Sequence, residues 1–155
     1  MDIRIALENE TVASVGYPKP VVVQKDSTVK SAVDTMAREK TGCILIQDGE
    51  TLVGIFTERD FISRVLDNRD AFGQPIKDFM TPDPLVARTD EPLYQVLSRF
   101  LQHDVRNLPV LDKKHLPVGI LPVRRVVHFL ADYHPTTVYN LPPDPKQMHS
   151  SPEGG

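Results

Sequence analysis

The hydrophobic and polar residues of this chain follow a pattern that occurs twice. In each copy a short apolar run, at residues 21–23 or 85–87, precedes apolar positions spaced i, i+3, i+4 and i+7, as on one face of a helix. The two series lie 64 residues apart and comprise Val29, Ala32, Val33 and Met36, then Leu93, Val96, Leu97, Phe100 and Leu101. The pattern predicts a strand followed by an amphipathic helix in each copy.

Two further apolar runs predict a hairpin after each helix. Residues 44–46 and 52–56 flank a turn at 48–49, and residues 108–111 and 118–121 flank a turn at 112–114. The offset is now 65 residues, so the second turn is one residue longer. A last apolar helix closes each copy, with Phe61, Ile62, Val65 and Leu66 in the first and Val126, Val127, Phe129 and Leu130 in the second. The unit is therefore strand, helix, strand, strand, helix.

The two units are expected to form one α/β globule. Each has about 50 residues, which is marginal for an isolated core, and strands that are apolar on both faces need a cover on each side. Packing the two sheets about a pseudo-two-fold axis meets both needs and predicts a crevice between them, a common place for a ligand. The expected segments are a lead-in (1–20), the first unit (21–70), a connection (71–84), the second unit (85–133) and a Pro-rich, mobile tail (134–155).

Composition narrows the class of protein. The 155 residues are 40% hydrophobic and 25% charged with a net charge of −3, which is typical of a globular chain. No apolar stretch approaches the roughly 18 residues that span a bilayer, and Lys and Arg are spread too thinly for a nucleic-acid binder. The single cysteine, Cys43, favours a reducing compartment. We therefore expect a cytoplasmic protein that binds neither membrane nor nucleic acid.

The segment Gly-Ile-Phe-Thr-Glu-Arg-Asp at residues 54–60 lies where a strand meets a helix. Thr57 and Asp60 have the spacing of a capping box, in which each side chain bonds the other residue's backbone. The same geometry also suits a ligand, because free N–H groups at a helix start attract phosphate and a carboxylate beside them can accept from ribose hydroxyls. Both interpretations remain open for these two residues.

With these residues the chain resembles a tandem pair of cystathionine-β-synthase (CBS) domains, also called a Bateman module. The resemblance covers about residues 21–133 and rests on the repeat, on residues 54–60, on Phe-Met-Thr-Pro at 79–82 and on Arg-Asn-Leu-Pro-Val at 106–110. It implies a regulatory module that binds an adenine nucleotide, with phosphate at Thr57 and ribose at Asp60. It also implies a homodimer and a regulated protein, whose identity is unknown. Because the pair fills the body of the chain, a stand-alone module is expected.

The expected ligand is AMP, ADP, ATP or S-adenosylmethionine, since all share the adenosine part. Thr57 and Asp60 are the first candidates for binding it; Gly54 would permit close backbone approach, and Arg59, Arg38 and Arg106 are candidates for phosphate. Binding would favour one orientation of the two units. The alternative is a module without ligand affinity that serves to dimerise or to dock a partner.

The second junction, residues 119–125, departs from this pattern. Pro122 stands in place of the hydroxyl and Arg125 in place of the carboxylate, and a guanidinium has no acceptor for a ribose hydroxyl. One ligand per chain is therefore expected, with Arg125 either solvated or bound to an anion. The histidines lack metal-site spacing, and neither a hydrolase nucleophile motif nor a Gly-rich phosphate loop is present. We expect no metal, no catalytic cofactor and no enzymatic activity.

Overall fold

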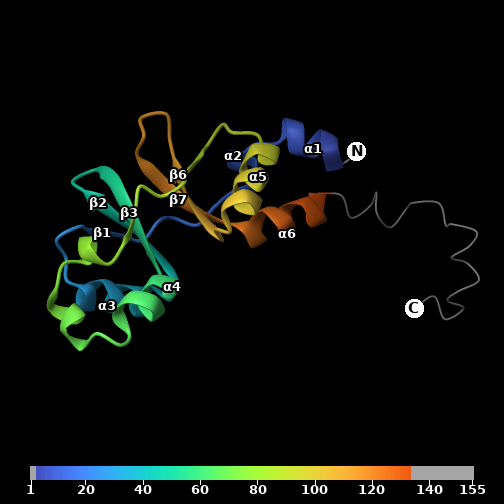
Figure 1. The fold of residues 1–155 in the computed structure, drawn as a ribbon. Coiled ribbons are helices and arrows are strands. Elements are labelled where there is room, and N and C mark those ends of the chain that lie inside the picture. Colours follow the sequence, from blue (N-terminus) through green and yellow to red (C-terminus); the bar gives the residue numbers. More distant parts are fainter. Residues whose placement is uncertain (1–2, 134–155) are drawn as a thin grey trace, which may run out of the picture.

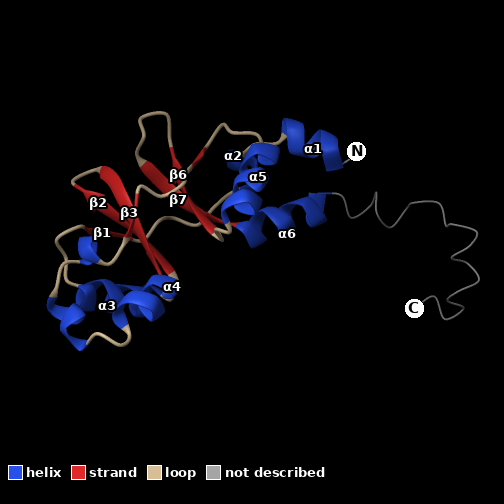
Figure 2. Ribbon diagram, in the orientation of Figure 1, coloured by secondary structure: helices blue, strands red, loops and turns tan. Residues whose placement is uncertain are grey.

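The computed structural model describes residues 3–133, and the predicted tail lies outside the described residues (Figure 1). The chain forms two sheets, one with the strand order β1-β2-β3-β4 and the other with the order β5-β6-β7. Helices α3 and α4 lie beside the first sheet, and α5 and α6 lie beside the second (Figure 2). The predicted α/β class with two repeats is confirmed.

Both repeats contain the predicted elements in the predicted order. In each, the first strand pairs parallel with the second, and the second pairs antiparallel with the third. The first repeat comprises β1 (Val22–Gln24), α3 (Val29–Glu39), β2 (Cys43–Asp48), β3 (Thr51–Thr57), α4 (Glu58–Asp60) and the π-helical turn η1 (Phe61–Val65). The second comprises β5 (Ala87–Arg88), α5 (Leu93–His103), β6 (Asn107–Leu111), β7 (Pro117–Pro122) and α6 (Val123–Tyr133). The closing helices differ, because only the first contains a π-helical turn.

The long helices bury most of the apolar positions that the spacing indicated, but Leu101 of α5 is 84% exposed. Val29, Ala32 and Met36 of α3 are buried, as are Leu93, Val96 and Phe100 of α5. Each helix ends at a residue in the left-handed conformation, Lys40 with φ 54° and Asp104 with φ 49°. The two turns that follow these helices therefore have the same backbone geometry but opposite side-chain charge.

The connection between the repeats folds back onto the first repeat. It contains the 3-10 helices η2 (Arg69–Gly73) and η3 (Ile76–Asp78) and the short strand β4 (Thr81–Pro82). In β4, Thr81 and Pro82 pair with Ile55 and Gly54 of β3. Ile76 is buried in the same apolar cluster as α3. The connection thus completes the first sheet.

The N-terminal segment crosses to the second repeat, where it forms α1 (Ile3–Asn9) and α2 (Val12–Val15) beside α5 (Figure 1). The backbone N–H of Val12 donates to the carbonyl of Glu91 at 3.0 Å, and the side chain of Val12 is fully buried in the second core. The N–H of Ile120 in β7 donates to the carbonyl of Pro18 at 3.2 Å. Residues 17–18 therefore border the second sheet as Thr81–Pro82 borders the first.

Alternation along the hairpin strands explains why they are apolar on both faces. Ile44, Ile46 and Phe56 pack under α3. The residues next to them along the strands point to the opposite face, where they meet the other sheet. That second cluster contains Cys43, Leu45, Ile55 and, from the other repeat, Ile120. Within residues 3–133, no helix has the length and apolarity needed to cross a membrane.

Candidate functional site

The junction between β3 and α4 contains a capping box formed by Thr57 and Asp60. The backbone N–H of Thr57 donates to Oδ2 of Asp60 at 3.0 Å, and the N–H of Asp60 donates to Oγ1 of Thr57 at 3.3 Å. The Thr57 hydroxyl also lies 3.1 Å from Oδ2 of Asp60. The capping interpretation of this motif is confirmed, and it holds the hydroxyl and the carboxylate together.

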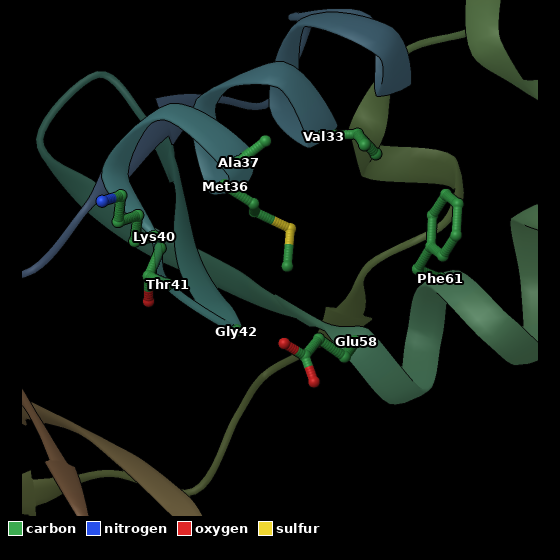
Figure 3. Close-up of a pocket in the computed structure, with 8 residues that line it drawn as sticks. All are labelled: Val33, Met36, Ala37, Lys40, Thr41, Gly42, Glu58 and Phe61. Atoms are coloured by element: carbon green, nitrogen blue, oxygen red, sulfur yellow. The ribbon is translucent and has the colours of Figure 1, made fainter.

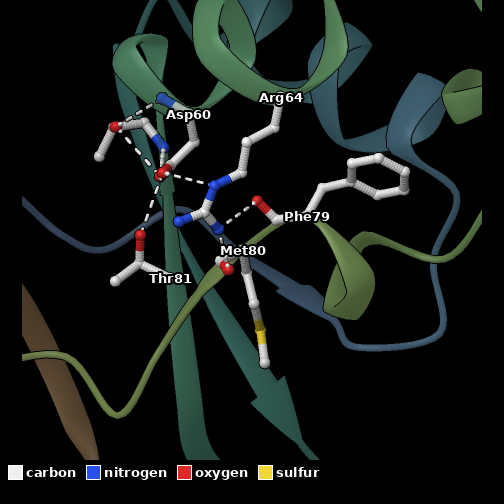
Figure 4. Close-up of polar contacts among 6 residues, drawn as sticks. Asp60, Arg64, Phe79, Met80 and Thr81 are labelled. Atoms are coloured by element: carbon white, nitrogen blue, oxygen red, sulfur yellow. Dashed lines mark hydrogen bonds and ion pairs between the residues drawn. The ribbon is translucent and has the colours of Figure 1, made fainter. Parts of the chain in front are cut away.

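The other oxygen of Asp60 faces the connection (Figure 4). The hydroxyl of Thr81 donates to Oδ1 of Asp60 at 3.0 Å, and Nε of Arg64 lies 3.9 Å from the same oxygen. Nη1 of Arg64 in turn donates to the carbonyls of Phe79 at 3.2 Å and Met80 at 2.6 Å. Asp60, which is 7% exposed, is thereby tied to a segment about 20 residues further along the chain.

Thr81 and Arg64 are not among the site residues predicted from the sequence. Thr81 belongs to the Phe-Met-Thr-Pro motif, but the motif gives no sign that its hydroxyl faces Asp60. Arg64 lies four residues after Asp60, and this helical spacing is the signal that could have identified it.

The hydrogen bonds leave Asp60 some acceptor capacity. A carboxylate offers about four lone-pair positions. Three donors reach Asp60 within hydrogen-bond distance, two of them at Oδ2 and one at Oδ1. Two of these donors are threonine hydroxyls, which can rotate to other acceptors. The site can therefore accept from a hydroxyl group of a ligand.

Cys43 lies beside this carboxylate, opposite Thr57 in the β2–β3 ladder. Burial raises the pKa of the Cys43 thiol to about 12, and the negative charge of Asp60 adds to the effect. The thiol is therefore neutral at physiological pH, as expected for a structural cysteine.

Gly54 permits a close approach, and the group that approaches is Met80. A Cβ atom at residue 54 would collide with the side chain of Met80 and lie 3.0 Å from the carbonyl oxygen of Thr81. Gly54 therefore lets β4 lie directly against β3.

The three arginines chosen from sequence lie in different places. Arg59 of α4 reaches across to the second repeat, where its Nη1 lies 4.0 Å from Oδ2 of Asp104. Arg106 precedes β6, two residues after Asp104, and its carbonyl accepts from the N–H of Val123. Arg38 of α3 pairs with its neighbour Glu39 at 3.7 Å. Arg59 and Arg106 thus both flank the turn at Asp104, whereas Arg38 has no partner in common with them.

A cavity of about 340 Å³ lies between α3 and α4 (Figure 3). Its wall includes Val33, Met36 and Phe61, and Lys40 and Glu58 add opposite charges. None of the six residues selected from the sequence lines it.

The second junction differs from the first at three positions. Pro122 and Arg125 replace the hydroxyl and the carboxylate, as noted from the sequence. Tyr17 has the place that Met80 has at the first junction, and its ring fills the space next to Gly119 as the Met80 side chain does next to Gly54. A Cβ atom added at Gly16 would lie 3.9 Å from Nη2 of Arg125. This junction therefore lacks the hydroxyl–carboxylate cluster of the first.

Among residues 3–133, no group of three or more His, Cys, Asp and Glu side chains is arranged to hold a metal ion.

Two parts of the chain match a known protein family: residues 12–67 and 76–132 each match the CBS domain. The chain belongs to the CBS domain family. Both matched ranges include segments outside the units expected from the sequence, which began at residues 21 and 85.

Individual proteins resemble this chain over most of its length. An uncharacterised 17.7 kDa protein of Acidianus ambivalens is 28% identical over 124 residues, which is 79% of this chain and 74% of that protein. The solved structure of CBSX2 from Arabidopsis thaliana in complex with AMP is 29% identical, with a TM-score of 0.69, over 79% of this chain and 97% of CBSX2. Inosine-5'-monophosphate dehydrogenase of Aquifex aeolicus is 30% identical, but the match covers 70% of this chain and only 22% of the enzyme.

Proposed function

We propose that this CBS pair is a non-catalytic regulatory module that binds an adenosine-containing ligand at the junction of β3 and α4. The observation that carries the proposal is the cluster in which Asp60, held by Thr57 and Thr81, presents a carboxylate with remaining acceptor capacity. The AMP complex of CBSX2, a protein of the same family, supports this ligand class. AMP, ADP, ATP and S-adenosylmethionine all remain candidates.

In the proposed complex the ribose hydroxyls donate to Asp60, while the phosphate lies near the start of α4 with Arg59 and Arg106. These two arginines come from different repeats. A ligand that engages both favours one relative orientation of the repeats, to the extent that its affinity differs between orientations. The regulated protein would respond to that orientation.

A screen of thermal stability tests the proposal. Adenosine, AMP, ADP, ATP and S-adenosylmethionine are each added to the full chain, with guanosine and GMP as controls. A ligand at about 100 times its Kd adds roughly 2.7 kcal/mol to the free energy of unfolding, so at least one adenosine compound should raise Tm. The rise should disappear in Asp60→Asn. No rise with any adenosine compound would refute the proposal.

The second candidate function is assembly without a ligand. It is favoured by the extensive pairing of Asp60 within the protein and by exposed apolar side chains on the closing helices. Ile62 of η1, Leu66 directly after η1 and Val127 of α6 are all more than half exposed, and exposed apolar patches mark interaction surfaces. We propose that this surface forms a homodimer, which is compatible with either function.

A further inference from the structure

Arg64, Arg59 and Arg106 differ in the partners of their guanidinium groups. Arg64 is engaged by Asp60 and by the carbonyls of Phe79 and Met80. Arg59 has the carboxylate of Asp104 4.0 Å from its guanidinium. Among the described residues, the side chain of Arg106 has no hydrogen bond or ion pair. Of these three arginines, Arg106 is thus the one without a side-chain partner among the described residues.

The carboxylate at residue 104 is not required by the backbone. Asp104 ends α5 in a left-handed conformation, with φ 49° and ψ 40°. Its counterpart 64 residues earlier, Lys40, ends α3 with φ 54° and ψ 44°. The same turn therefore accepts either charge, and the side chain of Asp104 is 91% exposed. The left-handed conformation suits Asp and Asn alike, so neither it nor packing requires the negative charge.

Asp104 also adjoins both arginines that are proposed to hold phosphate. It precedes Arg106 by two residues and faces Arg59 across the two repeats. A ligand whose phosphates engage both arginines must therefore lie close to this carboxylate. Each added phosphate brings more negative charge beside it, while adenosine brings none.

We propose that Asp104 determines the charge selectivity of the nucleotide site, disfavouring ATP relative to AMP. This inference rests on the proposed function. The carboxylate acts in two ways: it competes with phosphate for Arg59, and it repels the phosphate chain directly. Both effects increase with the number of phosphates.

The test compares the Kd values of adenosine, AMP and ATP, measured by titration calorimetry without divalent cations, for the wild-type chain and Asp104→Asn. Asparagine tolerates the left-handed conformation, so the turn should be retained. Removing a charge about 4 Å from the ligand's partner should improve ATP binding about fivefold, corresponding to about 1 kcal/mol. AMP should gain less, and adenosine should not change. Glu50→Gln removes the same charge at the far end of β3, beyond Thr51, and should leave all three Kd values unchanged.

Salt and a second variant separate the two effects. The gain should shrink at about 1 M salt, where the Debye length falls to about 3 Å. In Asp104→Asn combined with Arg59→Gln, the part of the gain that depends on Arg59 should be lost. An unchanged ratio of AMP to ATP affinity in Asp104→Asn, with adenosine bound normally, would overturn the inference alone. Absence of binding by all three compounds to both proteins would overturn the proposed function and this inference with it.

Discussion

The hydroxyl of Thr81 lies 3.0 Å from Oδ1 of Asp60, which joins the connection between the repeats to the cap of α4. Asp60 is nearly inaccessible to solvent, so this hydrogen bond fixes the direction of its carboxylate. The β4 strand brings Thr81 to this position by pairing with Ile55. Thr81 and Asp60 therefore belong to one cluster, although they are 21 positions apart in the sequence.

Thr81→Val should therefore weaken ligand binding, although Thr81 is not a member of the capping box. Valine has a similar shape but removes the donor to Asp60, at a cost of about 1 kcal/mol in the free energy of unfolding. We expect a lower affinity for AMP in calorimetry and a small fall in Tm, and both should recover in Thr81→Ser. Unchanged AMP affinity in folded Thr81→Val would show that Thr81 does not position Asp60 for the ligand.

Asp60→Ala should remove adenosine binding while the chain remains folded. The change leaves three donors without their acceptor, so we expect a loss of about 1–3 kcal/mol in the free energy of unfolding, measured by urea denaturation. Asp67→Ala, which removes an exposed carboxylate in the turn after η1, serves as control. If Asp60→Ala binds adenosine as tightly as the wild type, Asp60 has only its capping role.

The neutral thiol of Cys43 predicts a loss of stability in alkaline solution. Its pKa is about 12 in the folded chain against an ordinary value of 9.0. Between these values the unfolded chain releases the thiol proton and the folded chain keeps it, so the free energy of unfolding falls as the pH rises. From pH 8 to pH 10 we expect a loss of about 1 kcal/mol from this group.

The same urea titrations on Cys43→Ala give the control. Tyrosine and lysine side chains titrate equally in both proteins, so the difference between the two pH slopes isolates the thiol. Parallel slopes would contradict the effect of burial on Cys43.

Ile62→Glu should convert the proposed dimer to a monomer. Ile62 is 63% exposed, so a charge there does not disturb the core, but it would be buried without a partner in a dimer interface. Light scattering should give a mass close to the 17.4 kDa of one chain. Leu101→Glu is the matched control, because Leu101 is 84% exposed and belongs to α5, which is not one of the closing helices. A wild-type chain that is already monomeric would refute the dimer.

Calorimetry should give one adenosine ligand per chain. Pro122 and Arg125 replace the hydroxyl and the carboxylate of the cluster at the first junction. A ribose there would leave polar groups unsatisfied, at about 1–3 kcal/mol each, which weakens binding tenfold or more. Arg125→Ala should leave the measured affinity unchanged. Two ligands per chain would contradict the expected asymmetry.

The amino-acid sequence by itself determined the repeat, the order of the elements and the pairing of Thr57 with Asp60. These features depend on spacings of a few residues, because side chains at i+3 and i+4 share a helix face and a capping box closes within one turn. The loss of the hydroxyl and the carboxylate at the second junction is equally visible at Pro122 and Arg125.

Only the tertiary structure decided which distant segments complete each repeat. Residues 17–18 border the second sheet and Thr81–Pro82 the first, so the groups that face Asp60 and Gly119 come from segments outside the units expected from the sequence. Arg59 and Asp104 lie within the expected units, but only the tertiary structure shows that they meet across the repeats. Such contacts depend on the path of the whole chain and on how the two sheets pack. The spacing of residues within a single element indicates neither.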